Sequence, residues 1–169
     1  MSIVFALGVS PAQAAPAWER DYAVKTTGIS NSRPCTIVMA DYQVTRGDNA
    51  TASACYAIKG DYMKAIDGKA DGKAAVMKWE YFPNQDAAVK RRGVCIYTGG
   101  STAPYRAGTC NKDLPEKGLI RIWAGVRNVS GSTSLHDMTF GPDYVCLAFN
   151  GSKAVGYSRA GCEMALNRG

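Results

Sequence analysis

The chain has 169 residues, a formal net charge of +6 and six cysteines. This length suits one domain with a sizeable core, and beyond the N-terminus no stretch reaches the roughly 18 apolar residues of a membrane span. The one basic cluster, Lys90-Arg91-Arg92, is short. It lacks the interleaved aromatic residues of a nucleic-acid surface, so we expect neither a membrane span nor a nucleic-acid partner.

Residues 1–14, MSIVFALGVSPAQA, have the pattern of a secretory signal. Ile3–Val9 form a short apolar core, and Ala12-Gln13-Ala14 is a small-x-small site that a signal peptidase accepts. A buried strand fits this stretch less well because Ser10-Pro11 interrupts it and charged residues follow. The sequence therefore predicts a secreted, extracellular protein, although the positive charge that usually opens a signal is missing.

Residues 15–34 have little periodicity and mix charged residues with Thr, Ser, Asn, Gly and Pro. We expect them to form an extended N-terminal arm that leads to a β domain over residues 35–169. Trp18 and Tyr22 in this arm would dock either on the domain itself or on another protein.

The rest of the chain alternates apolar and polar residues in short runs separated by Gly, Pro and Asn turns. This pattern predicts an all-β, disulfide-stapled antiparallel β-sandwich or small barrel with at most short helical turns. Residues 61–66 fit a short strand or one helical turn, and residues 85–92 fit one or two helical turns. The expected strands are residues 36–45, 53–59, 75–81, 94–98, 105–110, 119–126 and 134–140, followed by a hairpin within 139–162.

Asn150-Gly151 is the dipeptide preferred in a two-residue type I′ hairpin turn. A turn there places Cys146 opposite Val155, seven residues before Cys162. Those residues span roughly 23 Å in a straight strand, whereas a disulfide needs Cα atoms about 4.4–6.8 Å apart. Either Gly161 lets the tail double back, or the two cysteines pair elsewhere.

An even number of cysteines in an exported chain predicts three disulfides, with 15 possible pairings. If residues 105–110 fold back around the turn at 99–102, Cys95 lies opposite Cys110, and we expect this pair to bond. There is no Cys-x-x-Cys pair, so we predict neither a metal site nor a cofactor. The six are Cys35, Cys55, Cys95, Cys110, Cys146 and Cys162.

No catalytic residue is predicted. His136 is the single histidine, and Asp137 beside it would point to the opposite face of a strand. Residues 156–160, GYSRA, resemble a nucleophile elbow, but no histidine follows them. Glu80 is a lone acid on its strand, whereas glycoside hydrolysis needs two acids in one cleft. We therefore expect a protein that is not an enzyme.

Nine tyrosines and three tryptophans against four phenylalanines favour contact surfaces. Tyr97, Tyr105 and Arg106 border a Gly/Ser/Thr-rich loop whose composition resembles a paratope. Together with Trp18 and Tyr22, they are the predicted partner-binding residues.

The predicted function is binding to another secreted or surface protein. Such a protein would be an adaptor or subunit of a secreted assembly, such as a toxin complex, or an inhibitor of an extracellular enzyme. The first alternative is a carbohydrate-binding module in which Trp79 and Tyr81, on one strand face, form a platform for a glycan. The second is a small secreted hydrolase built around His136 or Glu80.

Overall fold

The computed structural model describes residues 14–26, 52–57, 60–100, 106–130, 134–142, 144–151 and 153–166. Most of the predicted signal, the predicted strand 36–45 and Tyr105 lie outside these residues. The described elements are β1 (Trp18–Tyr22), β2 (Val24–Thr26), β3 (Ala52–Ala57), β4 (Tyr62–Asp67), β5 (Lys73–Phe82), β6 (Arg91–Tyr97), β7 (Arg106–Asn111), β8 (Lys117–Asn128), η1 (Leu135–Asp137), β9 (Met138–Phe140), β10 (Val145–Asn150), β11 (Lys153–Tyr157) and α1 (Arg159–Leu166).

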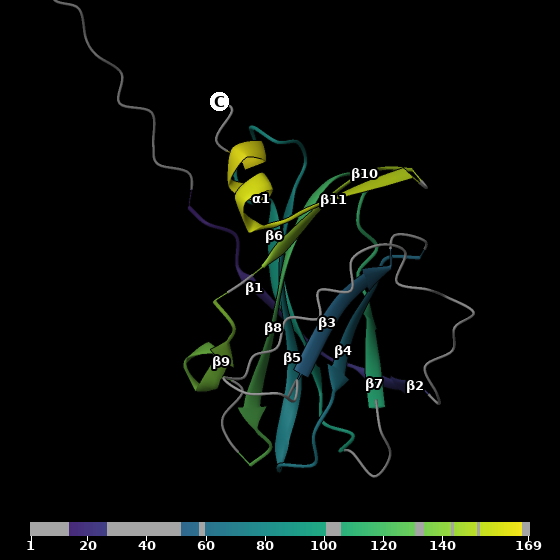
Figure 1. The fold of residues 1–169 in the computed structure, drawn as a ribbon, viewed down its shortest axis with the longest axis vertical. Coiled ribbons are helices and arrows are strands. Elements are labelled where there is room, and N and C mark those ends of the chain that lie inside the picture. The colour runs from purple at the N-terminus through teal and green to yellow at the C-terminus, as the bar shows by residue number, and fades with distance from the viewer. Residues whose placement is uncertain are drawn as a thin grey trace, which may run out of the picture.

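The strands form two sheets, which confirms the all-β prediction (Figure 1). A seven-stranded sheet has the order β1-β6-β5-β8-β10-β11, with β9 also paired to β8. A four-stranded sheet has the order β2-β7-β4-β3. All pairs are antiparallel except β1 with β6. Within the described residues neither sheet closes into a barrel.

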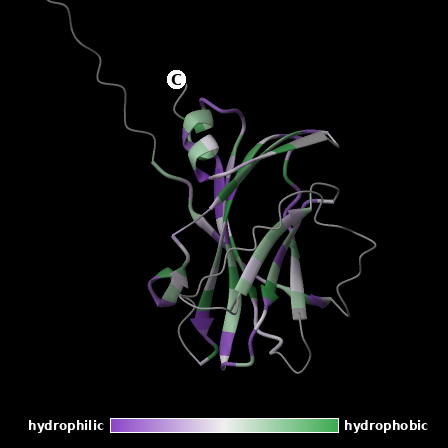
Figure 2. Ribbon diagram, viewed as in Figure 1, coloured by the Kyte–Doolittle hydropathy of each residue, from purple (hydrophilic) through white to green (hydrophobic). Residues whose placement is uncertain are grey.

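The main hydrophobic core lies between the two sheets. Tyr56 and Met63 enter it from the four-stranded sheet, and Trp79, Tyr97 and Leu147 enter it from the seven-stranded sheet. Side chains alternate along a strand, so one face of β5 carries Ala75, Met77, Trp79 and Tyr81 into this core, as the predicted pattern requires. Figure 2 shows the hydrophobic colours along the strands and hydrophilic colours at the lower ends of β5 and β8.

The opposite face of the seven-stranded sheet, which we call the outer face, is also partly covered. Cys162 and Ala165 of α1 pack with Phe82 and Leu119 at one end of it, and Met138 of β9 packs with Val76 and other residues at the other end. In Figure 1, α1 and β9 lie on the side away from the four-stranded sheet. Burial on both faces explains why β8 is apolar almost without interruption.

The predicted disulfide Cys95–Cys110 is present, with the two Cα atoms 5.9 Å apart. Its geometry differs from the expected one, because β6 and β7 lie in different sheets and do not pair. The bond therefore crosses the core and ties one sheet to the other. Cys55 is also disulfide-bonded, and Cys35 lies outside the described residues.

Cys146 and Cys162 also form a disulfide, with Cα atoms 5.5 Å apart. Two corrections to the predicted hairpin explain how they meet. Asn150 pairs with Lys153, so Cys146 lies opposite Tyr157 rather than Val155. The chain then turns into α1, in which each residue advances about 1.5 Å instead of 3.3 Å, and this brings Cys162 back over the sheet.

Two other local predictions are settled by the structure. Residues 61–66 belong to a strand, since β4 covers Tyr62–Asp67. The helical turns predicted for residues 85–92 are wrong. A turn held by hydrogen bonds from the amides of Asp86 and Ala87 to Asn84 occupies the first part, and β6 begins at Arg91. The pairing of β6 with β1 and β5 outweighs the weak local preference of this segment for helical turns.

Candidate functional site

The predicted N-terminal arm contains the edge strands of both sheets. We call residues 18–26 the strap. In the strap, β1 is the terminal strand of the seven-stranded sheet and β2 is the terminal strand of the four-stranded sheet. Ala23 joins them, donating its amide to the carbonyl of Ile96 (2.7 Å) and packing against the core. The strap therefore spans from one sheet to the other along a single edge of the domain.

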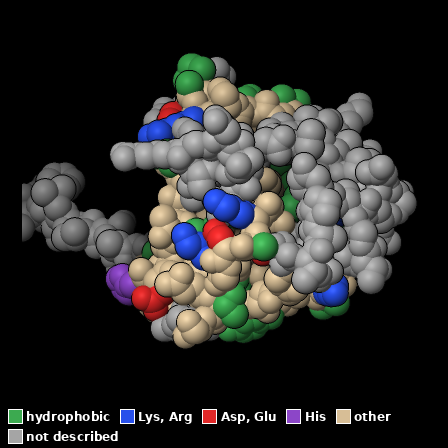
Figure 3. All heavy atoms as spheres, turned by 60° about the horizontal axis from the view of Figure 1, so that its bottom comes forward, with side chains coloured by type: hydrophobic (Ala, Val, Ile, Leu, Met, Phe, Trp, Pro, Cys, Tyr) green, Lys and Arg blue, Asp and Glu red, His purple; other side chains and the backbone are tan. Residues whose placement is uncertain are grey.

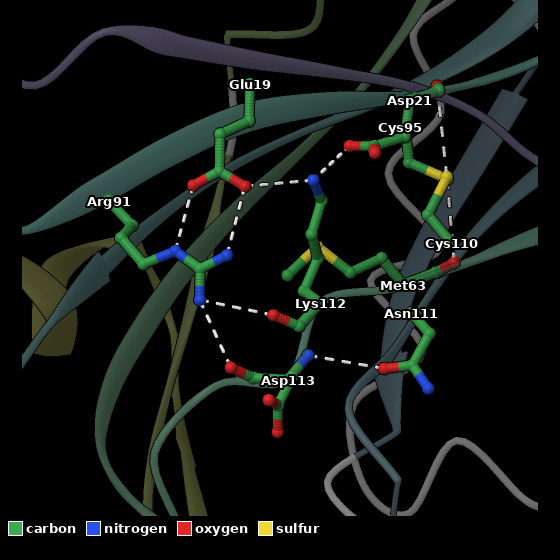
Figure 4. A network of polar contacts seen from close by, with 9 residues as sticks. All are labelled: Glu19, Asp21, Met63, Arg91, Cys95, Cys110, Asn111, Lys112 and Asp113. Atoms are coloured by element: carbon green, nitrogen blue, oxygen red, sulfur yellow. Dashed lines mark hydrogen bonds and ion pairs between the residues drawn. A yellow bond between two sulfur atoms is a disulfide. The ribbon is translucent and has the colours of Figure 1, made fainter.

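A network of charges fixes the strap to the domain (Figure 4). The Glu19 carboxylate accepts hydrogen bonds from Arg91 Nε (2.9 Å) and Nη2 (3.0 Å) and from Lys112 Nζ (3.0 Å). Lys112 also forms an ion pair with Asp21. Arg91 Nη1 donates to the carbonyls of Lys112 and Asp113, both at 3.1 Å. Two carboxylates of β1 thus meet two cations that come from β6 and from the chain after β7.

The charges of this network are matched and partly desolvated. The Lys112 side chain is only 6% exposed. The hydrogen bond from Arg91 is the main reason why the pKa of Glu19 lies below its ordinary value, although burial opposes this shift. The same hydrogen bond raises the pKa of Arg91. Glu19 is therefore an ionised anchor, and its carboxylate does not suit a proton-donating role.

Gly93 lets the strap lie close to β6. It is paired with Glu19 in the parallel ladder. A Cβ atom at Gly93 would lie 2.6 Å from the Glu19 carbonyl oxygen and 2.8 Å from the Trp79 ring. No side chain larger than hydrogen fits there without moving the strap or the core.

The two aromatic residues of the strap have different surroundings. Trp18 is half-buried on the outer face, and the Arg92 guanidinium lies 4.7 Å from its ring centroid. Arg92 Nε also donates to the carbonyl of Pro16 (2.7 Å). Tyr22 at the end of β1 is 56% exposed, and Val24 at the start of β2 is 74% exposed. Trp18 thus docks on its own domain, whereas Tyr22 and Val24 present apolar surface to solvent.

The other predicted contact residues do not join this surface. Tyr97 is 1% exposed and belongs to the core, because alternation along β6 places it on the same face as Cys95. This corrects the expectation that Tyr97 contacts a partner. Arg106 begins β7, and Tyr105 lies outside the described residues.

The residues considered for catalysis lie apart from one another. His136 is exposed in η1. Figure 3 shows the histidine colour at the edge of the drawn face beside an acidic side chain, and a group of Lys, Arg and acidic side chains near the centre of that face. Ser158 accepts a hydrogen bond from the amide of Gly161 (3.5 Å) at the start of α1. Glu80 is paired with Arg121. Within the described residues, no group of three His, Cys, Asp or Glu side chains is arranged to hold a metal ion.

Trp79 and Tyr81 do share one face of β5, but that face is the core between the sheets. Both rings are buried, so they cannot form the glycan platform considered above. Tyr81 uses its hydroxyl to donate to the Lys117 carbonyl (2.8 Å).

Sequence reasoning missed the charge network of the strap. Glu19 and Arg91 are 72 positions apart, and no local pattern connects them. The available signal was the alternation of Glu19 and Asp21, which places two acids on one face of a short strand.

No family model, curated protein or solved structure matches this chain. None of the described helices has the length and apolar character needed to cross a membrane.

Proposed function

We propose that this chain is a secreted, non-catalytic binding protein that contacts another protein through its strap. The observation that supports this proposal is the exposure of Tyr22 and Val24 on a segment that a partly buried charge network fixes to the domain. A rigid contact surface loses little conformational entropy on binding. An adaptor or subunit of a secreted assembly, or an inhibitor of an extracellular enzyme, would use such a surface.

The backbone of the strap suits addition of a strand. Among the described strands, β1 pairs only with β6 and β2 only with β7, so one side of each carries no described partner. A partner strand can add to such an edge through main-chain hydrogen bonds while side-chain contacts supply specificity. In this interpretation the domain is a β-sandwich, and the strap forms the edge that is used for binding.

The charge around this edge favours a partner with an acidic surface. Arg20 and Lys25 are exposed beside Tyr22 and Val24. Charges on an edge strand also suppress unspecific pairing between sheets. The same two residues can therefore prevent aggregation and steer an acidic partner toward the edge.

The proposal is tested by capturing proteins from the producer's culture fluid on immobilised protein and quantifying them by mass spectrometry. The test variant is Tyr22→Ser with Val24→Asp, and the matched control is Val129→Asp, since Val129 is 48% exposed and follows β8, outside the strap. We expect a defined partner to be lost with the strap variant and retained with the control. Equal capture by both variants would refute the proposal.

Point variants are preferable to deletion of the strap. Deletion would leave Arg91 and Lys112 without their carboxylates and would uncover the core beside Ala23. Thermal unfolding should show that each point variant stays within about 0.5 kcal/mol of the wild type, as is usual for exposed positions. Loss of binding can then be assigned to the surface itself.

A further inference from the structure

A second group of charges lies on the outer face of the seven-stranded sheet. We call Lys78, Arg92 and Arg121 the outer-face cation cluster. Glu80 is paired across the ladders with Arg92 on β6 and with Arg121 on β8, and Lys78 is two residues away on the same strand. Since Trp79 and Tyr81 point into the core, Lys78 and Glu80 point the other way.

Two of these cations lie against the same indole ring. Lys78 Nζ is 3.8 Å and the Arg121 guanidinium carbon is 5.0 Å from the centroid of Trp123. Arg121 Nη2 also pairs with Glu80 Oε2 at 2.5 Å. Both cations therefore lie beside Trp123, and Arg121 is close enough for its charge to lower the pKa of Lys78.

The charges in this cluster are not balanced. Three cations surround one carboxylate, and Lys78 Nζ forms no hydrogen bond or ion pair with any other residue that the structure describes. Burial is the main reason why the pKa of Lys78 lies below its ordinary value. Repulsion from Arg121 and Arg92 lowers it further, and Glu80 opposes the shift. A half-buried ammonium with this surplus of positive charge is stabilised by an added anion.

A buried hydroxyl group belongs to a residue beside this cluster. Tyr144 is 6% exposed, and its hydroxyl has no hydrogen-bond partner among the residues that the structure describes. Its ring centroid is 5.2 Å from that of Trp123 and 5.3 Å from the Arg121 guanidinium carbon. Buried polar atoms in folded proteins are nearly always hydrogen-bonded, so an unused donor here is a second indication of a missing ligand.

Contacts between cations and aromatic rings also occur as purely structural features. Contact with the rings of Trp123 and Phe140 explains why the Lys78 ammonium lies where it does. It does not explain why a half-buried ammonium lacks a carboxylate although three cations are close together. The strap network shows that this fold matches its buried charges elsewhere, with two carboxylates for two cations.

We infer that the outer-face cation cluster binds a doubly charged tetrahedral oxyanion, namely a sulfate or phosphate group. Lys78 and Arg121 are its direct ligands, and Arg92 adds positive charge. Three cations and one carboxylate leave a surplus of two positive charges, which a dianion neutralises. The planar guanidinium fork of Arg121 suits oxyanions, and Lys78 supplies a compact charge. Arg92 also contacts Trp18 of the strap, but the inferred anion site does not depend on the function proposed for the strap.

The test is a titration of the purified protein with sodium sulfate and with sodium phosphate at constant ionic strength, against sodium chloride. Tryptophan fluorescence reports binding, because Trp123 lies against both ligands, and Trp123→Phe should remove the signal. Lys78→Met keeps the apolar stem and should weaken sulfate binding about tenfold or more, as expected for loss of a charge-assisted contact. Glu80→Gln should strengthen binding, since it removes the one repelling carboxylate.

Lys90→Met is the matched control, because Lys90 is exposed and lies outside the cluster. Sulfate and phosphate affinities of this variant should equal those of the wild type. If Lys78→Met and Lys90→Met titrate alike, or if sulfate and phosphate act no differently from chloride, the inference is wrong. Calorimetric titration of each variant gives the same comparison without relying on fluorescence.

The source of the anion is distinguished with two polymers. Retention on phosphocellulose but not on cellulose, with loss of retention in Lys78→Met, indicates a phosphate monoester on a larger molecule, which is doubly charged above about pH 7. Binding of inorganic sulfate or phosphate without retention on phosphocellulose indicates a free anion. Retention that is unchanged in Lys78→Met would contradict the proposed site.

Discussion

Arg91 and Arg92 are neighbours in the sequence but belong to different groups of charges. Successive residues of β6 point to opposite faces of the sheet, so Arg91 meets Glu19 under the strap whereas Arg92 lies on the outer face. The strap network contains two cations and two carboxylates, and the outer-face cation cluster contains three cations and one carboxylate. The matched charges hold the strap in place, whereas we infer that the surplus positive charges of the outer-face cation cluster bind an anion.

The strongest test of this difference is removal of the buried lysine under the strap. Lys112→Met keeps the volume of the side chain but leaves Glu19 and Asp21 without their shared cation. We expect a loss of about 2 kcal/mol in the free energy of unfolding. This lies below the cost of breaking a fully buried pair because both carboxylates are about one-third exposed. Urea unfolding at neutral pH measures it, and Lys90→Met should change stability by less than about 0.5 kcal/mol.

A smaller effect on the free energy of unfolding is expected when the charge of Glu19 is removed by mutation or by low pH. A carboxyl group whose pKa is lowered on folding stabilises the protein above its ordinary pKa, here 4.5, and this contribution is lost as the pH falls through the folded value. Glu19→Gln should therefore cost about 1 kcal/mol at pH 7, given its partial exposure. The difference from the wild type should disappear in unfolding experiments below the folded pKa. A difference that persists unchanged at low pH would mean that the charge of Glu19 does not hold the strap.

The smallest effect on stability is expected on the outer face. Lys78→Met loses a cation–π contact but also removes a half-buried ammonium that Arg121 and Arg92 repel. A lysine whose pKa is lowered on folding destabilises the folded state at neutral pH, and this penalty fades as the pH rises through the folded value. The free energy of unfolding at pH 7 should therefore stay within about 0.5 kcal/mol of the wild type. A loss as large as that of Lys112→Met would show that Lys78 is a structural anchor.

Several features could be predicted because local patterns carry them. The alternation of residues 75–81 was sufficient to place a strand there, and the structure has β5 at Lys73–Phe82. The even number of cysteines predicted disulfides, and the pair Cys95–Cys110 is present. The reason given for that pair was wrong, since the bond joins two sheets rather than two arms of a hairpin.

The contact residues were harder to predict because the exposure of each side chain depends on tertiary packing. Both faces of β6 are apolar, so nothing in the local pattern showed that Tyr97 faces the core with Cys95. Trp18 and Tyr22 are four residues apart and looked equivalent, yet only Tyr22 is well exposed. Residues far away in the sequence determine whether each ring is buried.

The sequence was enough to establish the class of the fold and the presence of disulfides, because side-chain alternation, turn residues and cysteine number are local properties. Tertiary structure decided where the strap lies, how Cys146 reaches Cys162 and which charges meet. The reason is physical. Glu19, Arg91 and Lys112 come from three separate segments, and their charges interact only when the two sheets share one core. The outer-face cation cluster likewise exists only because β6, β5 and β8 lie side by side.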